Sequence, residues 1–90
     1  MSKANIGDLV EVEWLDSTGR TGWEHFTFYE DWARKQQDRV HWTAGYLVAE
    51  DRKSVTVTLS WTDLDDDTHI SDCMSIPKVA VKRVRVVERA

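Results

Sequence analysis

The chain has 90 residues, 41% of them hydrophobic and 31% charged, with a formal net charge of −4 at pH 7. This length suits one domain, and the composition excludes a chain that is disordered over most of its length. The negative charge argues against binding to duplex nucleic acid through the whole surface, and the single cysteine excludes an internal disulfide.

The start, MSKANIGDLV, has one lysine and no apolar stretch behind it, so it does not resemble a secretory signal. The longest apolar runs are only a few residues, too short to span a bilayer. We therefore expect residues 1–90 to form a single soluble domain of the cytoplasm with no membrane contact.

Residues 8–15 (DLVEVEWL) alternate between apolar and polar side chains. Val10, Val12 and Trp14 share one face, which is typical of a half-buried strand. The residues that follow, 16–20, predict a turn because they combine aspartate, serine and glycine.

The hydrophobic period then changes to that of a helix. Thr27 and Glu30 have the spacing of a capping box, with Thr27 as the N-cap residue. Phe28 and Trp32 recur at helical spacing behind it. The pattern predicts a short helix over residues 27–37, with Phe28 and Trp32 packed against the strands.

The second half of the chain predicts four more strands. Residues 39–49 and 54–61 alternate and are separated by a polar turn, which indicates a hairpin. Pro77 ends the next strand because it cannot donate to a ladder. The remaining elements are a strand over 70–76, a tight turn over 77–80 and a strand over 81–87.

Period-two placement also predicts the core, because alternate residues of a strand face the same way. The expected core residues are Val10, Val12, Trp14, Val40, Trp42, Tyr46, Val48, Val55, Val57, Leu59, Ile76, Val84 and Val86.

This order of elements predicts a mainly β fold. Five short strands in a small chain favour a strongly bent antiparallel barrel, here with one short helix inserted after the first strand. A tight turn just before the final strand is familiar from SH3-like and Sm-like barrels, so by analogy we expect a barrel of that kind.

Four stretches resemble short uncharacterised proteins encoded by tailed bacteriophages and prophages. They are VEVEWLDS, Gly22-Trp23, GYLVAEDRKSVTV and IPKVAV. The resemblance implies a small viral accessory protein in the cytoplasm of a bacterial host, and it implies no activity. The resemblance implies a structural role, and no chemical one, for six positions: Gly45, Leu47, Glu50, Asp51, Ile76 and Pro77.

The acidic segment has the spacing of a calcium loop only at its start. Asp63, Asp65 and Asp67 match positions one, three and five of an EF-hand, but Thr68 replaces the glycine and Met74 the bidentate glutamate. We expect the run from Asp63 to Asp67 to be a solvated hairpin tip, and its further role stays open.

The sequence offers no convincing metal site or nucleophile. His69 and Cys73 share a strand face, but four residues span about 13 Å, too far to ligate one zinc ion. A nucleophilic cysteine needs basic neighbours, whereas the nearest charge to Cys73 in the sequence is that of Asp72, so we expect Cys73 to be a small buried side chain. With no nucleophile, base and orienting group at matching positions, we expect neither an enzyme nor a cofactor.

The last strand is basic, and its role has two readings. Arg83 and Arg85 share a face, and in a small barrel the first strand, with Glu11 and Glu13, lies beside the last. The simplest interpretation is a ladder of cross-strand ion pairs. The alternative is that Arg83 and Arg85 bind phosphate oxygens at a cleft or subunit interface.

The binding site is expected on the long connection before and within the helix. Trp23 and Phe26 have no clear period, so they either cap the barrel end or, with Tyr29, border a partner-binding patch or an oligomer interface. The first hypothesis for function is a module that binds and inhibits a host protein or defence component. The alternative is an oligomeric sponge for a small nucleotide, which rests on fold analogy alone. Neither hypothesis involves binding to a specific nucleic-acid sequence.

Overall fold

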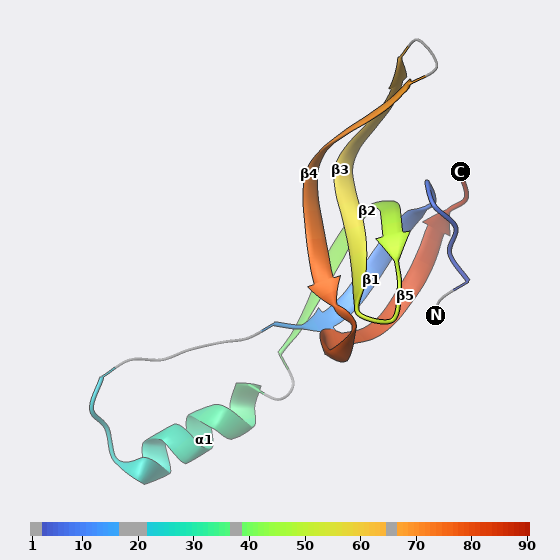
Figure 1. Ribbon diagram of the computed structural model, residues 1–90. Helices are drawn as coiled ribbons and strands as arrows, with labels where there is room; N and C mark the ends of the chain where they lie inside the picture. Colours follow the sequence, from blue (N-terminus) through green and yellow to red (C-terminus); the bar gives the residue numbers. More distant parts are fainter. Residues whose placement is uncertain (1–2, 17–21, 37–38, 65–66) are drawn as a thin grey trace.

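The computed structural model describes residues 3–16, 22–36, 39–64 and 67–90 (Figure 1). These parts form one five-stranded antiparallel sheet and one α-helix, so the predicted mainly β class is confirmed. The elements are β1 (Leu9–Leu15), α1 (Phe26–Gln36), β2 (Val40–Glu50), β3 (Ser54–Leu64), β4 (Asp67–Pro77), the 3₁₀ turn η1 (Lys78–Ala80) and β5 (Val81–Glu88).

The strands lie in the order β4-β3-β2-β1-β5, so the first and last strands are neighbours, as predicted. β4 and β5 form the two edges of an open sheet. The strands and the turn before β5 fall where the sequence predicts them, but β3 and the start of β4 extend three residues further than expected. Of the predicted turn over 16–20, Asp16 alone is among the described residues.

The core consists of six apolar side chains from four strands. Five of them were predicted and are confirmed, and Trp14, Val84 and Val86 pack against this cluster. The sixth, Leu47, was expected to face outward. The six residues are Val10, Val12, Leu47, Val55, Val57 and Ile76.

The prediction of which face of β2 is buried is wrong. Leu47 is 1% exposed, whereas Trp42 is 61% exposed and Tyr46 lies on the outer face. Gly45 is the reason: it pairs with Val10 on the inner face, and a Cβ there would lie 2.8 Å from the carbonyl oxygen of Thr58. The close approach of β3 requires glycine on the face that β2 buries, so Leu47 is buried beside it.

The predicted burial of Leu59 is also wrong. The β3–β4 register skips Leu59 and Asp72, and Asp72 has a φ of 61°. Thr58 is buried instead, with its hydroxyl 2.6 Å from the carbonyl oxygen of Ser71. β3 pairs with β2 only as far as Thr58, so Leu59 lies beyond the part of the sheet that encloses the core and is 69% exposed.

The helix begins one residue earlier than predicted and lies away from the sheet (Figure 1). The carbonyl of His25 accepts the first helical hydrogen bonds, from the N–H groups of Phe28 at 3.0 Å and Tyr29 at 3.4 Å. His25 is therefore the N-cap residue, and Thr27 lies within the first turn. The extensive contacts between described elements all join strands to strands, so the predicted packing of α1 on the sheet is wrong.

Two of the expected scaffold positions shape the β2–β3 hairpin and its neighbour. Asp51 accepts hydrogen bonds from the N–H groups of Lys53 at 2.7 Å and Ser54 at 2.9 Å, and these bonds lower its pKa. Glu50, whose side chain is largely buried, pairs with Lys78 at 2.6 Å. The Glu50–Lys78 pair is a charge-assisted hydrogen bond that joins the end of β2 to the 3₁₀ turn.

A buried carboxylate joins the two ends of the described chain. Asp8 is 1% exposed and accepts hydrogen bonds from the N–H groups of Asn5 and Ala90 and from Nη1 of Arg89, each at 2.9 Å. The bonds from Asn5 and Ala90 hold the pKa of Asp8 below its usual range, and burial opposes them only in part. No pattern in the sequence predicted this contact.

Candidate functional site

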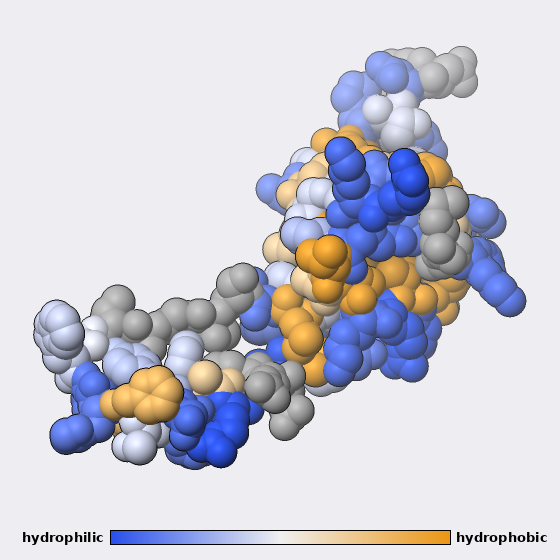
Figure 2. All heavy atoms as spheres, turned by 60° about the horizontal axis from the view of Figure 1, so that its bottom comes forward, coloured by the Kyte–Doolittle hydropathy of each residue, from blue (hydrophilic) through white to orange (hydrophobic). Residues whose placement is uncertain are grey.

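The most exposed aromatic side chains lie on the segment before α1 and on its first turn. Trp23 is 99% exposed and Phe26 is 76% exposed. Figure 2 shows the helix standing clear of the main body, with hydrophobic atoms on its surface. Because the hydrophobic effect favours burial, two large exposed rings on one short excursion mark this region as a candidate interaction surface.

Tyr29 attaches the segment that carries Trp23 to the helix. Its hydroxyl donates a hydrogen bond to the carbonyl oxygen of Gly22 at 2.6 Å, and Gly22 has a φ of 109° that favours glycine. Phe26 and Tyr29 are three positions apart, so they lie side by side on the helix. The structure thus brings together three predicted site residues, which we call the aromatic surface: Trp23, Phe26 and Tyr29.

The opposite side of α1 is polar and internally paired. Glu30 contacts Arg34 and Asp31 contacts Lys35, each pair at 3.1 Å and at the i,i+4 spacing. Exposed pairs of this kind stabilise a helix by about 0.3–0.5 kcal/mol each. The helix is therefore amphipathic, and its charged side is already satisfied by its own ion pairs.

Arg83 and Arg85 are placed elsewhere, on the outer face of β5. Arg83 contacts Glu13 and Arg85 contacts Glu11, both at 3.3 Å, in register across β1 and β5. The predicted cross-strand ladder is confirmed. These two arginines lie apart from the aromatic surface, so the five predicted binding residues fall into two groups.

The described residues provide no grouping suited to metal chemistry. No cluster of three or more His, Cys, Asp or Glu side chains that could hold a metal ion occurs in them. Cys73 is exposed on β4, which corrects the expectation that it is buried. β4 is an edge strand on which Ile76 is the one buried residue, so Cys73 is exposed like its neighbours.

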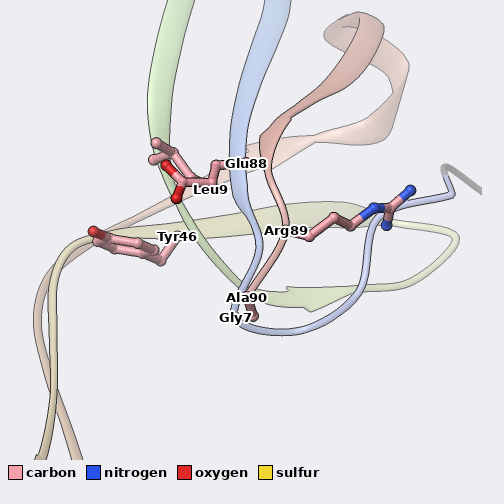
Figure 3. Close-up of a pocket in the computed structure, with 6 residues that line it drawn as sticks. All are labelled: Gly7, Leu9, Tyr46, Glu88, Arg89 and Ala90. Atoms are coloured by element: carbon pink, nitrogen blue, oxygen red, sulfur yellow. The ribbon is translucent and has the colours of Figure 1, made fainter.

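A shallow hollow at the end of the sheet was not foreseen from the sequence. It has a volume of about 120 Å³, and in Figure 3 Arg89 points away from Leu9 and Tyr46, toward the N-terminal segment. Arg89 is already engaged by Asp8, so the hollow is part of the contact between the chain ends. Its lining residues are Gly7, Leu9, Tyr46, Glu88, Arg89 and Ala90.

Comparisons of the chain with protein-family models, with curated proteins and with solved structures found no match. Within the described part of the chain, no helix has the length and apolar character needed to cross a membrane. Function is therefore inferred from the geometry of the site.

Proposed function

We propose that the protein is a non-catalytic binding module that recognises a partner protein through the aromatic surface. The observation that carries this proposal is the exposure of Trp23 (99%) on the segment before α1 and of Phe26 (76%) on its first turn, with no described strand in extensive contact with the helix. Tryptophan is enriched among the residues that dominate binding energy at protein interfaces. Rigid aromatic rings also lose little conformational entropy on binding.

The state of the helix supports the same proposal. An isolated helix of 11 residues is only marginally stable in water, and most helices gain stability by burying an apolar face. The charged residues on the polar side of α1 already form ion pairs with one another, so a partner gains most by covering the aromatic side. The partner therefore offers an apolar groove for an amphipathic helix, a common mode of peptide recognition.

We also propose that the sheet is a variant of the SH3-like or Sm-like barrel. The strand order, with β1 beside β5, and the 3₁₀ turn just before β5 support this. The resemblance to phage-encoded proteins supports an accessory role in the cytoplasm of a bacterial host, with a host enzyme or defence component as the partner. In that role the protein is an inhibitor or counter-defence module.

The nucleotide alternative finds less support. Phosphate recognition by Arg83 and Arg85 requires both guanidinium groups to leave Glu13 and Glu11, which they already contact at 3.3 Å. A bound phosphate would also lie beside these two carboxylates, and like charges repel. We therefore favour a protein as the partner.

Affinity capture from the bacterial host, combined with native mass spectrometry, tests this function. We expect Trp23→Ala and Phe26→Ala each to abolish capture of a partner that the unmodified protein retains. Both variants should keep their free energy of unfolding within about 0.5 kcal/mol, because the rings are exposed.

The matched control is Trp42→Ala, which removes an exposed indole from β2 and should leave capture unchanged. The proposal fails if Trp23→Ala retains the partner or if Trp42→Ala loses it equally. It also fails if Trp23→Ala destabilises the fold by about 3–5 kcal/mol, the cost of truncating a core aromatic residue.

A further inference from the structure

A two-stranded ribbon projects from the sheet. β3 pairs with β2 only as far as Thr58, and residues 60–64 then pair with residues 67–71 of β4. We call these two stretches the ribbon. It lies at the far end of the molecule from α1 (Figure 1), along a longest dimension of 60 Å. The ribbon is therefore a surface separate from the aromatic surface.

The base of the ribbon is structured. Leu59 and Asp72 are both skipped in the pairing, and Asp72 takes up the bend with a φ of 61°. The buried Thr58 hydroxyl lies 2.6 Å from the carbonyl oxygen of Ser71 and 3.1 Å from that of Ser60. These contacts tie both strands of the ribbon to the sheet, so its direction is set by the fold.

One side of the ribbon combines an indole, an aliphatic side chain and a carboxylate. Trp61 lies opposite Ile70 and Asp63 opposite Thr68, and residues two apart on a strand share a face. Trp61 is half-buried and Ile70 is exposed. Asp63 accepts a hydrogen bond from the Thr68 hydroxyl at 2.8 Å through one of its two carboxylate oxygens.

A hollow of about 160 Å³ lies on the ribbon and is bounded mostly by apolar surface. Trp61 and Asp63 are two residues apart on β3, which places them about 6.6 Å apart along the strand. This distance is close to the length of a long cationic side chain. The lining residues are Ser60, Trp61, Thr62, His69, Ile70 and Ser71.

Charge decides which ligand this surface attracts. Between Ser60 and Ser71 the sequence has four aspartates and no lysine or arginine. Such a segment repels phosphate groups and attracts cations. The occupant must therefore be basic, and it must have an apolar portion that can cover Trp61 and Ile70.

We propose that the ribbon binds an arginine side chain presented by a basic segment of a partner protein. The aliphatic part of the arginine lies on Ile70, and its guanidinium stacks on the indole of Trp61. The carboxylate of Asp63 accepts hydrogen bonds from the guanidinium. Arginine suits the site better than lysine because its planar group stacks on aromatic faces and matches a carboxylate. This surface is independent of the aromatic surface.

NMR titration with a blocked peptide of alternating arginine and alanine tests the proposal. We expect shifts confined to the ribbon and to the Trp61 indole N–H, with the same peptide built from lysine binding about two- to fivefold more weakly. A glutamate peptide should cause no shift. Equal affinity for the arginine and lysine peptides, or shifts centred elsewhere, overturns the proposal.

Variants separate a specific site from attraction by net charge. Trp61→Leu keeps an apolar side chain in the ribbon, and Asp63→Asn keeps its shape; each should weaken binding of the arginine peptide about fivefold. Trp23→Ala and Glu24→Gln remove the same kinds of group near α1 and should have no effect. If Glu24→Gln weakens binding as much as Asp63→Asn, the attraction is only by net charge and the proposal is wrong.

Discussion

At the scale of single residues, Asp8 shows how one charged side chain is held inside the protein. A buried carboxylate is costly unless hydrogen bonds stabilise its charged form. Asp8 receives three such bonds, two of them from the backbone N–H groups of Asn5 and Ala90 and one from Arg89. The same group therefore connects residues from both ends of the described chain.

This arrangement predicts a stability that depends on pH. The folded pKa of Asp8 is lower than the unfolded value, so its contribution to the free energy of unfolding is fully present above about pH 4. The contribution is lost as the pH falls through the folded pKa. We expect Asp8→Asn to lower the Tm at pH 7 and to differ less from the unmodified protein near pH 2.

Thermal unfolding at both pH values measures this difference. Asp31→Asn serves as the control, because its carboxylate is exposed and pairs only on the surface of α1. Equal losses of Tm from Asp8→Asn at pH 7 and pH 2 would show that the charge of Asp8 is not what stabilises the fold.

At the scale of elements, β2 shows why an alternating pattern can be assigned to the wrong face. Both faces of this strand carry apolar residues, so composition does not distinguish them. Gly45 contacts β3 closely, and Leu47 pairs with Val57 next to it on the inner face. The choice of face depends on this contact between strands.

The corrected register predicts unequal effects of two neighbouring substitutions. Leu47→Ala should cost about 2–5 kcal/mol in the free energy of unfolding, because the side chain is buried in the core. Tyr46→Ala should cost clearly less, because the ring lies on the outer face. Urea unfolding of both variants measures the two costs. A larger cost for Tyr46→Ala would mean that β2 buries the face that carries Tyr46, as the sequence pattern predicted.

At the scale of the whole molecule, the sheet and the helix differ in how they are stabilised. The strands bury a common core, whereas no strand makes extensive contact with α1 within the described residues. A helix of this length without such packing opens readily. The molecule thus combines a stable sheet with a helix that a partner can cover.

Hydrogen exchange should reveal this difference. We expect the amides of α1 to exchange about a hundredfold faster or more than those of Val10 and Val12, since local opening costs far less than unfolding of the sheet. Protection of α1 should rise when a partner binds the aromatic surface. Equal protection of helix and sheet in the free protein would mean that α1 is packed after all.

Much of the fold and part of the candidate site could be predicted from local patterns. Alternation marked the strands, and the analogy with small barrels placed the first strand beside the last. The charges of Glu11, Glu13, Arg83 and Arg85 then predicted the ion pairs between these two strands. The lack of a core period around Trp23 singled out the segment before α1. These features depend on residues close in sequence or on simple complementarity of charge.

Only the tertiary structure decided which face of β2 is buried, where α1 lies and how far β3 and β4 extend beyond the sheet. The first and last of these depend on contacts between residues distant in sequence, such as Gly45 with Thr58 and Thr58 with Ser71. The amphipathic pattern of α1 correctly predicted a helix with one aromatic side, but not what covers that side. A local pattern determines which residues share a face, because the backbone repeat is local; what that face contacts depends on the packing of the whole chain.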